Sequence, residues 1–308
     1  MFSVIFPGQG SQIVGMGKEF YDKYDFVKRL FNEADDLLNI SLSKIILEGP
    51  KDQLNLTANT QPAIFLVSYS IFQVVKKEFN IDLNKASFFA GHSLGEYSAI
   101  ACAGYLDFQN TIKILKIRGH AMQNSMPEGE GGMVAVLGTT VENIENILKD
   151  NENHFKAEIA NDNSDGQIVV SGKNKDLEEL GLFLKKNKIK NIKLPVSAPF
   201  HCSLMNKATS IMREELNKLK FVEGNNCLIS NITADEISNA DGLKDLLIKQ
   251  IENRVRWRES VINIIQKGVS QFIEIGPGKV LSGLVKRINK DVEVSSLNNE
   301  DDIKNIKI

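Results

Sequence analysis

A serine at the centre of a glycine-flanked turn is the residue best placed for chemistry. Ser93 lies in the pattern GHSLG at residues 91–95, the G-x-S-x-G spacing of a nucleophilic serine between a strand and a helix. The apolar run 88–90 predicts a buried strand, and the small residues 98–103 predict a closely packed helix. Free amides at the start of that helix would stabilise an oxyanion. A structural alternative, in which Ser93 only caps the helix, stays open at this point.

A serine nucleophile needs a base, and His201 is the best-placed histidine. Four histidines occur, at positions 92, 120, 154 and 201, and none has the H-E-x-x-H spacing of a zinc site, so no metal is predicted. His201 stands between a loop and a predicted helix, where its imidazole could take the serine proton. Hydrolases with serine before histidine place an acid between the two. Here the intervening acids fall in predicted helices or in an inserted segment, so a carbonyl is the alternative partner.

One loop could bind an anion, and one helix carries an arginine. The predicted strand Phe2–Phe6 runs into the glycine-rich loop at residues 7–12, whose amides could approach a negative charge. A dinucleotide fingerprint would need glycine where Ile13 stands, and no phosphate-loop motif occurs, which disfavours nucleotide binding. Arg118 lies in the predicted helix Phe108–Met126. By itself it is interpreted as a solvated surface charge.

Composition excludes several classes of protein. The 308 residues include 37 Lys and Arg against 39 Asp and Glu, so no strong field favours nucleic acid or an anionic membrane. Three cysteines without a C-x-x-C pair disfavour a disulfide framework or a zinc site and indicate a reducing compartment. The first residues lack the basic start of a signal peptide. We therefore expect a cytoplasmic protein.

The order of predicted elements indicates two parts. Residues 133–194 follow the order strand, helix, strand, strand, helix, strand, which is that of a ferredoxin-like unit. We predict an α/β-hydrolase-like core with a short parallel sheet, formed by residues 1–128 and 196–308, and an inserted ferredoxin-like subdomain at residues 129–195. Within it, residues 161–166 are predicted to form a turn. A helix is expected from Pro62 to Phe79, and the tail 298–307 is expected to be loosely ordered.

Eight stretches match one protein family in this order. They are FPGQGSQ (6–12), TQPA (60–63), GHSLGEY (91–97), RG (118–119), FH (200–201), Gln250, VRW (255–257) and EIGPG (274–278). On these motifs the chain resembles the malonyl-coenzyme A:acyl carrier protein transacylases of fatty acid synthesis, from its first strand almost to its end. One departure is Arg254, which stands where the family often has proline.

The resemblance implies a role for each candidate residue. Ser93 would carry the acyl group, and His201 would act as its general base and acid. The backbone N–H groups of Gln12 and Leu94 would form the oxyanion hole. The carbonyl of Gln250 would orient His201, which accounts for the missing acid.

The resemblance also implies how the substrate is selected. Arg118 would pair with the free carboxylate of the malonyl group, which reverses its interpretation as a surface charge. A planar guanidinium binds a carboxylate through two hydrogen bonds and so favours a diacid thioester. Phe200, before His201, looks like the malonyl-preferring version of that position.

The implied activity is ping-pong transfer of a malonyl group from malonyl-CoA, through a malonyl-serine, to the phosphopantetheine thiol of acyl carrier protein. This reaction would supply chain-extender units for fatty acid biosynthesis. No metal or redox cofactor is implied, and malonyl-CoA and acyl carrier protein are the expected partners, with neither nucleic acid nor membrane and with a monomer favoured. Two alternatives remain: a serine hydrolase such as a thioesterase, and a carrier-protein-binding subunit whose serine is inert.

Overall fold

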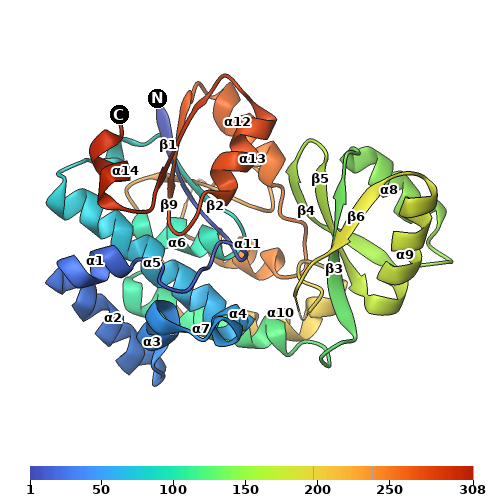
Figure 1. Ribbon diagram of the computed structural model, residues 1–308, viewed down its shortest axis with the longest axis horizontal. Helices are drawn as coiled ribbons and strands as arrows, with labels where there is room; N and C mark the ends of the chain where they lie inside the picture. The colour runs from blue at the N-terminus through green and yellow to red at the C-terminus, as the bar shows by residue number, and fades with distance from the viewer. Residues whose placement is uncertain (197, 238, 308) are drawn as a thin grey trace.

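The computed structural model describes residues 1–196, 198–237 and 239–307 and has a mixed α/β architecture (Figure 1). Its larger sheet has the strand order β10-β9-β1-β2-β7-β8. All neighbouring strands run parallel except β7 and β8. The strands are β1 (Phe2–Phe6), β2 (Phe88–Gly91), β7 (Cys227–Ile229), β8 (Glu236–Ile237), β9 (Gln271–Ile275) and β10 (Glu293–Leu297).

The two strands at the centre of this sheet carry the loops that matter for function. Every residue of β1 and β2 is buried, as expected for continuous apolar runs covered on both faces. They pair in parallel from Ser3 opposite Phe88 to Phe6 opposite Gly91. Their carboxyl ends therefore meet at one edge of the sheet, where the glycine-rich loop and the Ser93 turn follow.

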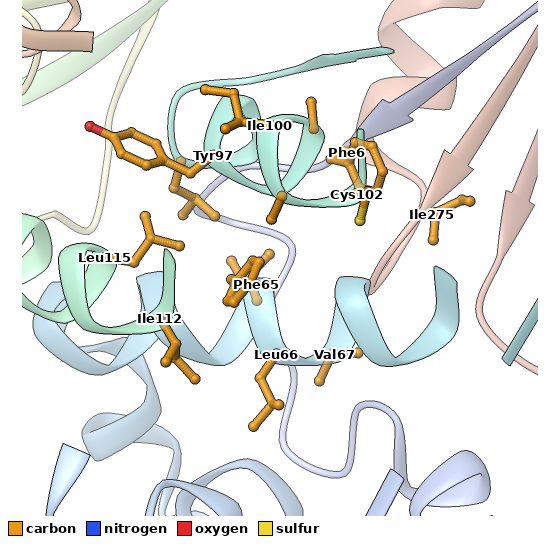
Figure 2. Packing of buried hydrophobic residues seen from close by; sticks show 14 of the residues in the cluster. Phe6, Phe65, Leu66, Val67, Tyr97, Ile100, Cys102, Ile112, Leu115 and Ile275 are labelled. Atoms are coloured by element: carbon orange, nitrogen blue, oxygen red, sulfur yellow. The ribbon is translucent and has the colours of Figure 1, made fainter. Parts of the chain in front are cut away.

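Helices α5 (Thr57–Glu78), α6 (Leu94–Cys102) and α7 (Phe108–Gln123) pack together beside this sheet. Phe65 of α5, Ile100 of α6 and Leu115 of α7 belong to one apolar cluster that also includes Phe6 of β1 (Figure 2). The other helices of this part are α1 (Lys18–Lys23), α2 (Asp25–Leu38), α3 (Leu42–Glu48), α4 (Lys51–Asn55), α10 (Asn206–Lys218), α11 (Leu243–Gln250), α12 (Trp257–Gln266), α13 (Val280–Ile288) and α14 (Glu300–Asn305). Burial of these apolar side chains holds α6 rigidly behind the turn.

A smaller antiparallel sheet, on the right of Figure 1, has the strand order β4-β5-β3-β6. Its strands are β3 (Gly131–Leu137), β4 (Ala157–Ser164), β5 (Gln167–Lys173) and β6 (Lys190–Lys193), and its helices are α8 (Val141–Asp150) and α9 (Asn174–Lys186). Val136, Ile144, Ile168 and Leu180 form part of an apolar cluster separate from that of the larger sheet. This sheet therefore has its own core.

The turn predicted for residues 161–166 is wrong for its first four residues, because β4 continues to Ser164 and only Asp165 and Gly166 form the turn. Its last residues dock on the segment before α12: Asp162 N–H donates to Val255 O at 3.0 Å, and Val255 N–H donates to Ala160 O at 2.8 Å. The Asp162 carboxylate also pairs with Arg258 at 2.9 Å. These contacts with a distant segment override the turn preference of Asn and Asp side chains.

The start predicted for one helix and the loose order predicted for the tail are also wrong. Helix α5 begins at Thr57, so Pro62 lies inside it rather than at its start. The tail contains helix α14, which begins with a capping box between Asn299 and Asp302 and buries Ile303. Reciprocal capping bonds and one buried side chain order a segment whose composition is polar.

None of the helices in the described ranges is both long enough and apolar enough to cross a bilayer.

Candidate active site

The turn at Ser93 has a strained backbone. Ser93 adopts φ 55° and ψ −110° between β2 and α6, a conformation that costs a non-glycine residue about 1–3 kcal/mol. A Cβ on Gly91 would lie 2.0 Å from the Gly95 carbonyl carbon, and a Cβ on Gly95 would lie 2.2 Å from Phe6 O. The two glycines are therefore required because α6 starts hard against β1 and β2. This packing presents the Ser93 hydroxyl at the end of the turn.

The structure brings Ser93, His201 and Gln250 into one chain of hydrogen bonds. Ser93 Oγ lies 2.8 Å from His201 Nε2. His201 Nδ1 lies 2.7 Å from the backbone oxygen of Gln250. Because a carbonyl only accepts, Nδ1 carries the proton and Nε2 is left to accept from the serine.

His201 is electrostatically suited to remain a neutral base. It is 4% exposed, and burial together with the positive charge of Arg118 lowers its pKa to about 3. At neutral pH the imidazole is therefore uncharged, with its proton on Nδ1 and its Nε2 lone pair facing the serine hydroxyl. The His201 ring therefore does not have to lose a proton before it can accept the proton of the Ser93 hydroxyl.

Arg118 is buried beside the serine and is not a surface charge. Its Nη2 donates to Ser93 Oγ at 3.1 Å and to Gln250 Oε1 at 2.8 Å, and its Nη1 donates to Gln61 Oε1 at 2.7 Å. The residue has no exposed surface, and burial lowers its pKa, although a guanidinium stays charged. Its Nε has no partner among the described residues. No carboxylate of residues 1–196, 198–237 or 239–307 forms an ion pair with Arg118, and a buried cation of this kind is suited to an anionic ligand.

Of the two predicted oxyanion donors, Leu94 lies at the cavity beside Ser93 and Gln12 does not. Leu94 is the first residue of α6, and no described group accepts a hydrogen bond from its N–H. Gln12 does not line the cavity at Ser93: its side chain accepts from Gly10 N–H at 2.7 Å and donates to Asn55 at 3.0 Å. Gly10 stands between the two glutamines with φ 105°, a left-handed conformation, and of the two it is Gln9 that lines the cavity.

A cavity of about 150 Å³ opens beside Ser93. This volume is about ten times the ~15 Å³ that a cavity needs, by the same measure, to hold one water molecule, which suits a short acyl group. Phe200 lies in its wall, and its predicted part in the preference for malonyl stays a prediction. The lining residues are Gln9, Gln61, His92, Ser93, Leu94, Met122, Met133, Asn161, Asn163, Val169, Leu194, Val196, Phe200 and His201.

Several polar residues at the site were not predicted from the sequence. Asn161 and Asn163 lie on the end of β4 that was mistaken for a turn, and Asn163 Oδ1 lies 2.8 Å from His92 Nε2. Gln61 and Glu96 stand within recognised motifs, which could have marked them. Asn231 carried no signal in the sequence; its Oδ1 accepts from Ser93 N–H at 2.7 Å.

The cysteine next to the base is a poor rival nucleophile. Cys202 Sγ donates to Pro199 O at 3.0 Å, and burial raises the pKa of its thiol to about 12. The thiolate is the reactive form of cysteine, so Cys202 is inert at neutral pH. Arg254, the departure from the family pattern, forms an ion pair with Glu145 at 2.8 Å.

Comparisons with known proteins agree over nearly the whole chain. The acyl transferase domain family matches residues 3–304. The malonyl CoA-acyl carrier protein transacylase of Bacillus subtilis (strain 168) is 42% identical over 301 residues, covering 97% of this chain and 94% of the relative. That of Escherichia coli (strain K12) is 37% identical, covering 96% of each.

Solved structures agree as well. The transacylase of the same description from Clostridium perfringens superimposes with a TM-score of 0.92 at 39% identity, covering 98% of this chain and 95% of the other. A malonyl-transacylase in complex with its type II PKS acyl-carrier protein has a TM-score of 0.94 at 36% identity, covering 98% and 97%.

Proposed function

The chain belongs to the malonyl CoA-acyl carrier protein transacylases, which are acyltransferases, and we propose that it transfers malonyl groups through an ester on Ser93. The donor is malonyl-CoA and the acceptor is acyl carrier protein, in support of fatty acid synthesis. The observation that carries the assignment of the nucleophile is the continuous chain from Ser93 Oγ through His201 to Gln250 O.

The first half of the reaction forms the ester. His201 Nε2 takes the hydroxyl proton while Ser93 Oγ attacks the thioester carbonyl of malonyl-CoA. The new C–O bond gives a tetrahedral oxyanion, whose collapse breaks the C–S bond, and His201 returns the proton to the leaving thiolate. The Gln250 carbonyl stabilises the imidazolium that exists between these two events.

The oxyanion is held by backbone amides. We assign the N–H groups of Leu94 and Gln9 to this role, with Gln9 in place of Gln12 because Gln9 lines the cavity. The Leu94 N–H lies at the start of α6, where the helix dipole adds positive potential. Donors fixed in this way stabilise the transition state without reorganising.

Arg118 selects the acyl group. A malonyl carboxylate would replace the contacts of the guanidinium with Ser93 Oγ and Gln61 Oε1, since Arg118 has no exposed surface of its own. The exchange frees Ser93 Oγ from a competing donor and leaves it bonded to His201 alone. Binding the correct diacid would thus activate the nucleophile.

The second half of the reaction reverses the first with another thiol. The phosphopantetheine thiol of acyl carrier protein gives its proton to His201 and attacks the Ser93 ester, which returns the hydroxyl and forms a malonyl thioester. A malonyl group bound in the mostly apolar cavity would occupy much of its volume and displace water from beside the ester. Exclusion of water protects the ester from hydrolysis.

We infer that the fold consists of an α/β-hydrolase-like core and a ferredoxin-like subdomain inserted at residues 129–195. The order β4-β5-β3-β6 with helices α8 and α9 between the strands supports the subdomain. The nucleophile turn at the carboxyl end of a parallel strand supports the core.

The test is incubation with malonyl-CoA followed by intact-mass measurement. We expect a mass increase of one malonyl group, mapped to the peptide containing Ser93 and removed by added acyl carrier protein faster than by water. Rapid release of malonate without an adduct would favour the hydrolase alternative. If neither an adduct nor malonate forms, the result would favour the alternative of a carrier-protein-binding subunit whose serine is inert.

A further inference from the structure

Both backbone groups of Ser93 are held by buried side chains from elsewhere in the chain. Its N–H donates to Asn231 Oδ1 at 2.7 Å, and its carbonyl accepts from Gln250 Nε2 at 3.0 Å. Asn231 Nδ2 also donates to Gly91 O at 2.7 Å. The Asn231 side chain is therefore hydrogen-bonded to the backbone at both ends of the segment from Gly91 to Ser93, where Ser93 has a strained backbone.

Glu96 connects the two side chains that hold the turn. It stands in the first turn of α6 and is 1% exposed. One carboxylate oxygen accepts from Asn231 N–H at 3.3 Å, and the other accepts from Gln250 Nε2. Gln250 also presents its backbone carbonyl to His201. Glu96 therefore contacts both Asn231, which holds the backbone of Ser93, and Gln250, which orients His201.

We propose that Asn231 and Glu96 are positioning residues that keep Ser93 in its strained conformation and in register with His201. The inference rests on the proposed role of Ser93 as the nucleophile. A backbone in a sparsely populated conformation persists only when surrounding contacts over-determine it. Asn231 supplies two of these contacts directly, and Glu96 fixes the Asn231 backbone and the Gln250 amide that supplies the third.

The ionised form of Glu96 is the one that fits its partners. Both neighbours are N–H donors, so only a carboxylate accepts from both, whereas a protonated carboxyl or a glutamine amide offers one acceptor. Burial, opposed by the hydrogen bonds of Gln250 and Asn231 and by Arg118, raises the pKa of Glu96 to about 7. The charged or titratable groups that interact electrostatically with it are Arg118 on α7 and Tyr97 on its own helix.

The experiment measures the reactivity of Ser93 itself. Phenylmethylsulfonyl fluoride forms an S–O bond with the serine oxygen as fluoride leaves and the hydroxyl proton passes to His201. We expect Asn231→Ala to slow this labelling by about 10- to 100-fold, as a misplaced nucleophile does. Malonyl-CoA binding, measured by calorimetry, should change by less than about threefold because Arg118 is unaltered.

Asn226→Ala is the matched control. Asn226 is also a buried asparagine, and its Nδ2 donates to the backbone oxygens of Asn84 and Ala86. Both variants lose an asparagine side chain and two hydrogen bonds to backbone groups, but Asn226 lies at the far end of β7 from the site. Its labelling rate should stay within about twofold of the wild type, by our expectation for a residue acting only on stability.

Glu96→Gln keeps the shape of the side chain and decides the question if Asn231→Ala does not fold. The wild-type labelling rate should fall about 3- to 10-fold as the pH drops through about 7, because protonation removes one acceptor. Glu96→Gln should have the low rate throughout and no such step between about pH 5 and pH 8, since His201 stays neutral there.

The outcomes separate this inference from the proposed function. Equal labelling rates in Asn231→Ala and Asn226→Ala, or a wild-type rate and pH profile in Glu96→Gln, would overturn the positioning role. A Ser93→Ala protein that still takes up malonyl groups or the sulfonyl label at the wild-type rate would instead overturn the proposed nucleophile.

Discussion

The two walls of the cavity are built on different principles. On the wall formed by the turn at Ser93, polar groups are buried and fixed by hydrogen bonds, and the backbone is strained. The wall formed by β3 and β5 presents Met133 and Val169, whose side chains can only make van der Waals contacts. Hydrogen-bonded geometry tolerates little displacement, whereas an apolar wall adjusts to its contents. Changes on the first wall should therefore decide whether transfer occurs, and changes on the second should decide which acyl group fits.

Replacement of the nucleophile should have the largest effect. Ser93→Ala should lower malonyl transfer by at least about 10⁴-fold and abolish the covalent adduct, because no other described hydroxyl lies within hydrogen-bonding distance of His201 Nε2. Steady-state transfer to acyl carrier protein and intact mass provide the two measurements.

Ser98→Ala is the control for this change. Ser98 lies on the same helix, is fully buried and has no hydrogen-bond partner among the described residues. It should retain near wild-type activity. An adduct in Ser93→Ala that maps to another residue would show that the nucleophile is elsewhere.

Replacement of the base should have the next largest effect. His201→Ala should slow transfer by about 10²- to 10⁴-fold at neutral pH, while binding of malonyl-CoA changes little because Arg118 stays in place. In the wild type, the pKa of about 3 means that His201 loses its basic form only in strongly acidic solution. Stopped-flow acylation between about pH 5 and pH 8, in the Glu96→Gln background, should therefore show no step from this ring. A step near pH 6.5 in that background would contradict the environment described for His201.

The parts of the site predicted from the sequence share one property: the chemistry is local. The strand, the turn and the helix around Ser93 follow one another within the chain, and their apolar and glycine pattern specifies the conformation. His201 is also indicated by its position between a loop and a predicted helix, but the role of Arg118 required the family resemblance, because nothing in its local sequence distinguishes a buried arginine from a surface cation.

The parts that were missed depend on contacts between distant segments. Residues 161–164 have the composition of a turn, yet pairing with Val255 and the ion pair with Arg258 extend the strand. Asn231 looks like any loop asparagine until the fold brings it to the backbone of Ser93. Gln9 and Gln12 differ only in which side of Gly10 they occupy, and the direction of that turn is a property of the folded loop. Local propensity cannot encode such pairings.

The Arg118→Ala variant tests whether the two walls divide their roles in this way. Arg118→Ala should lower malonyl transfer by about 10²- to 10³-fold, because an unpaired carboxylate in a closed site costs about 3–5 kcal/mol and each tenfold corresponds to about 1.4 kcal/mol. Transfer from acetyl-CoA, which has no carboxylate, should be unchanged or faster. The measurement is the ratio of kcat/KM for the two thioesters. Equal losses for both would mean that Arg118 supports the fold or binds the CoA moiety.

The smallest effect is expected on the apolar wall, and neighbouring residues of β3 provide a matched pair. Met133 lines the cavity, whereas Val134 points into the separate core of the smaller sheet. Both are 4% exposed, so truncation of either should lower the free energy of unfolding by about 1–5 kcal/mol. Only Met133→Ala enlarges the acyl site, and one methylene in an apolar pocket is worth about tenfold or more in discrimination. The kcat/KM of methylmalonyl-CoA relative to malonyl-CoA should therefore rise up to about tenfold in Met133→Ala and stay constant in Val134→Ala. If both variants shift the ratio equally, the apolar wall acts through general loosening of the smaller sheet and not through the shape of the cavity.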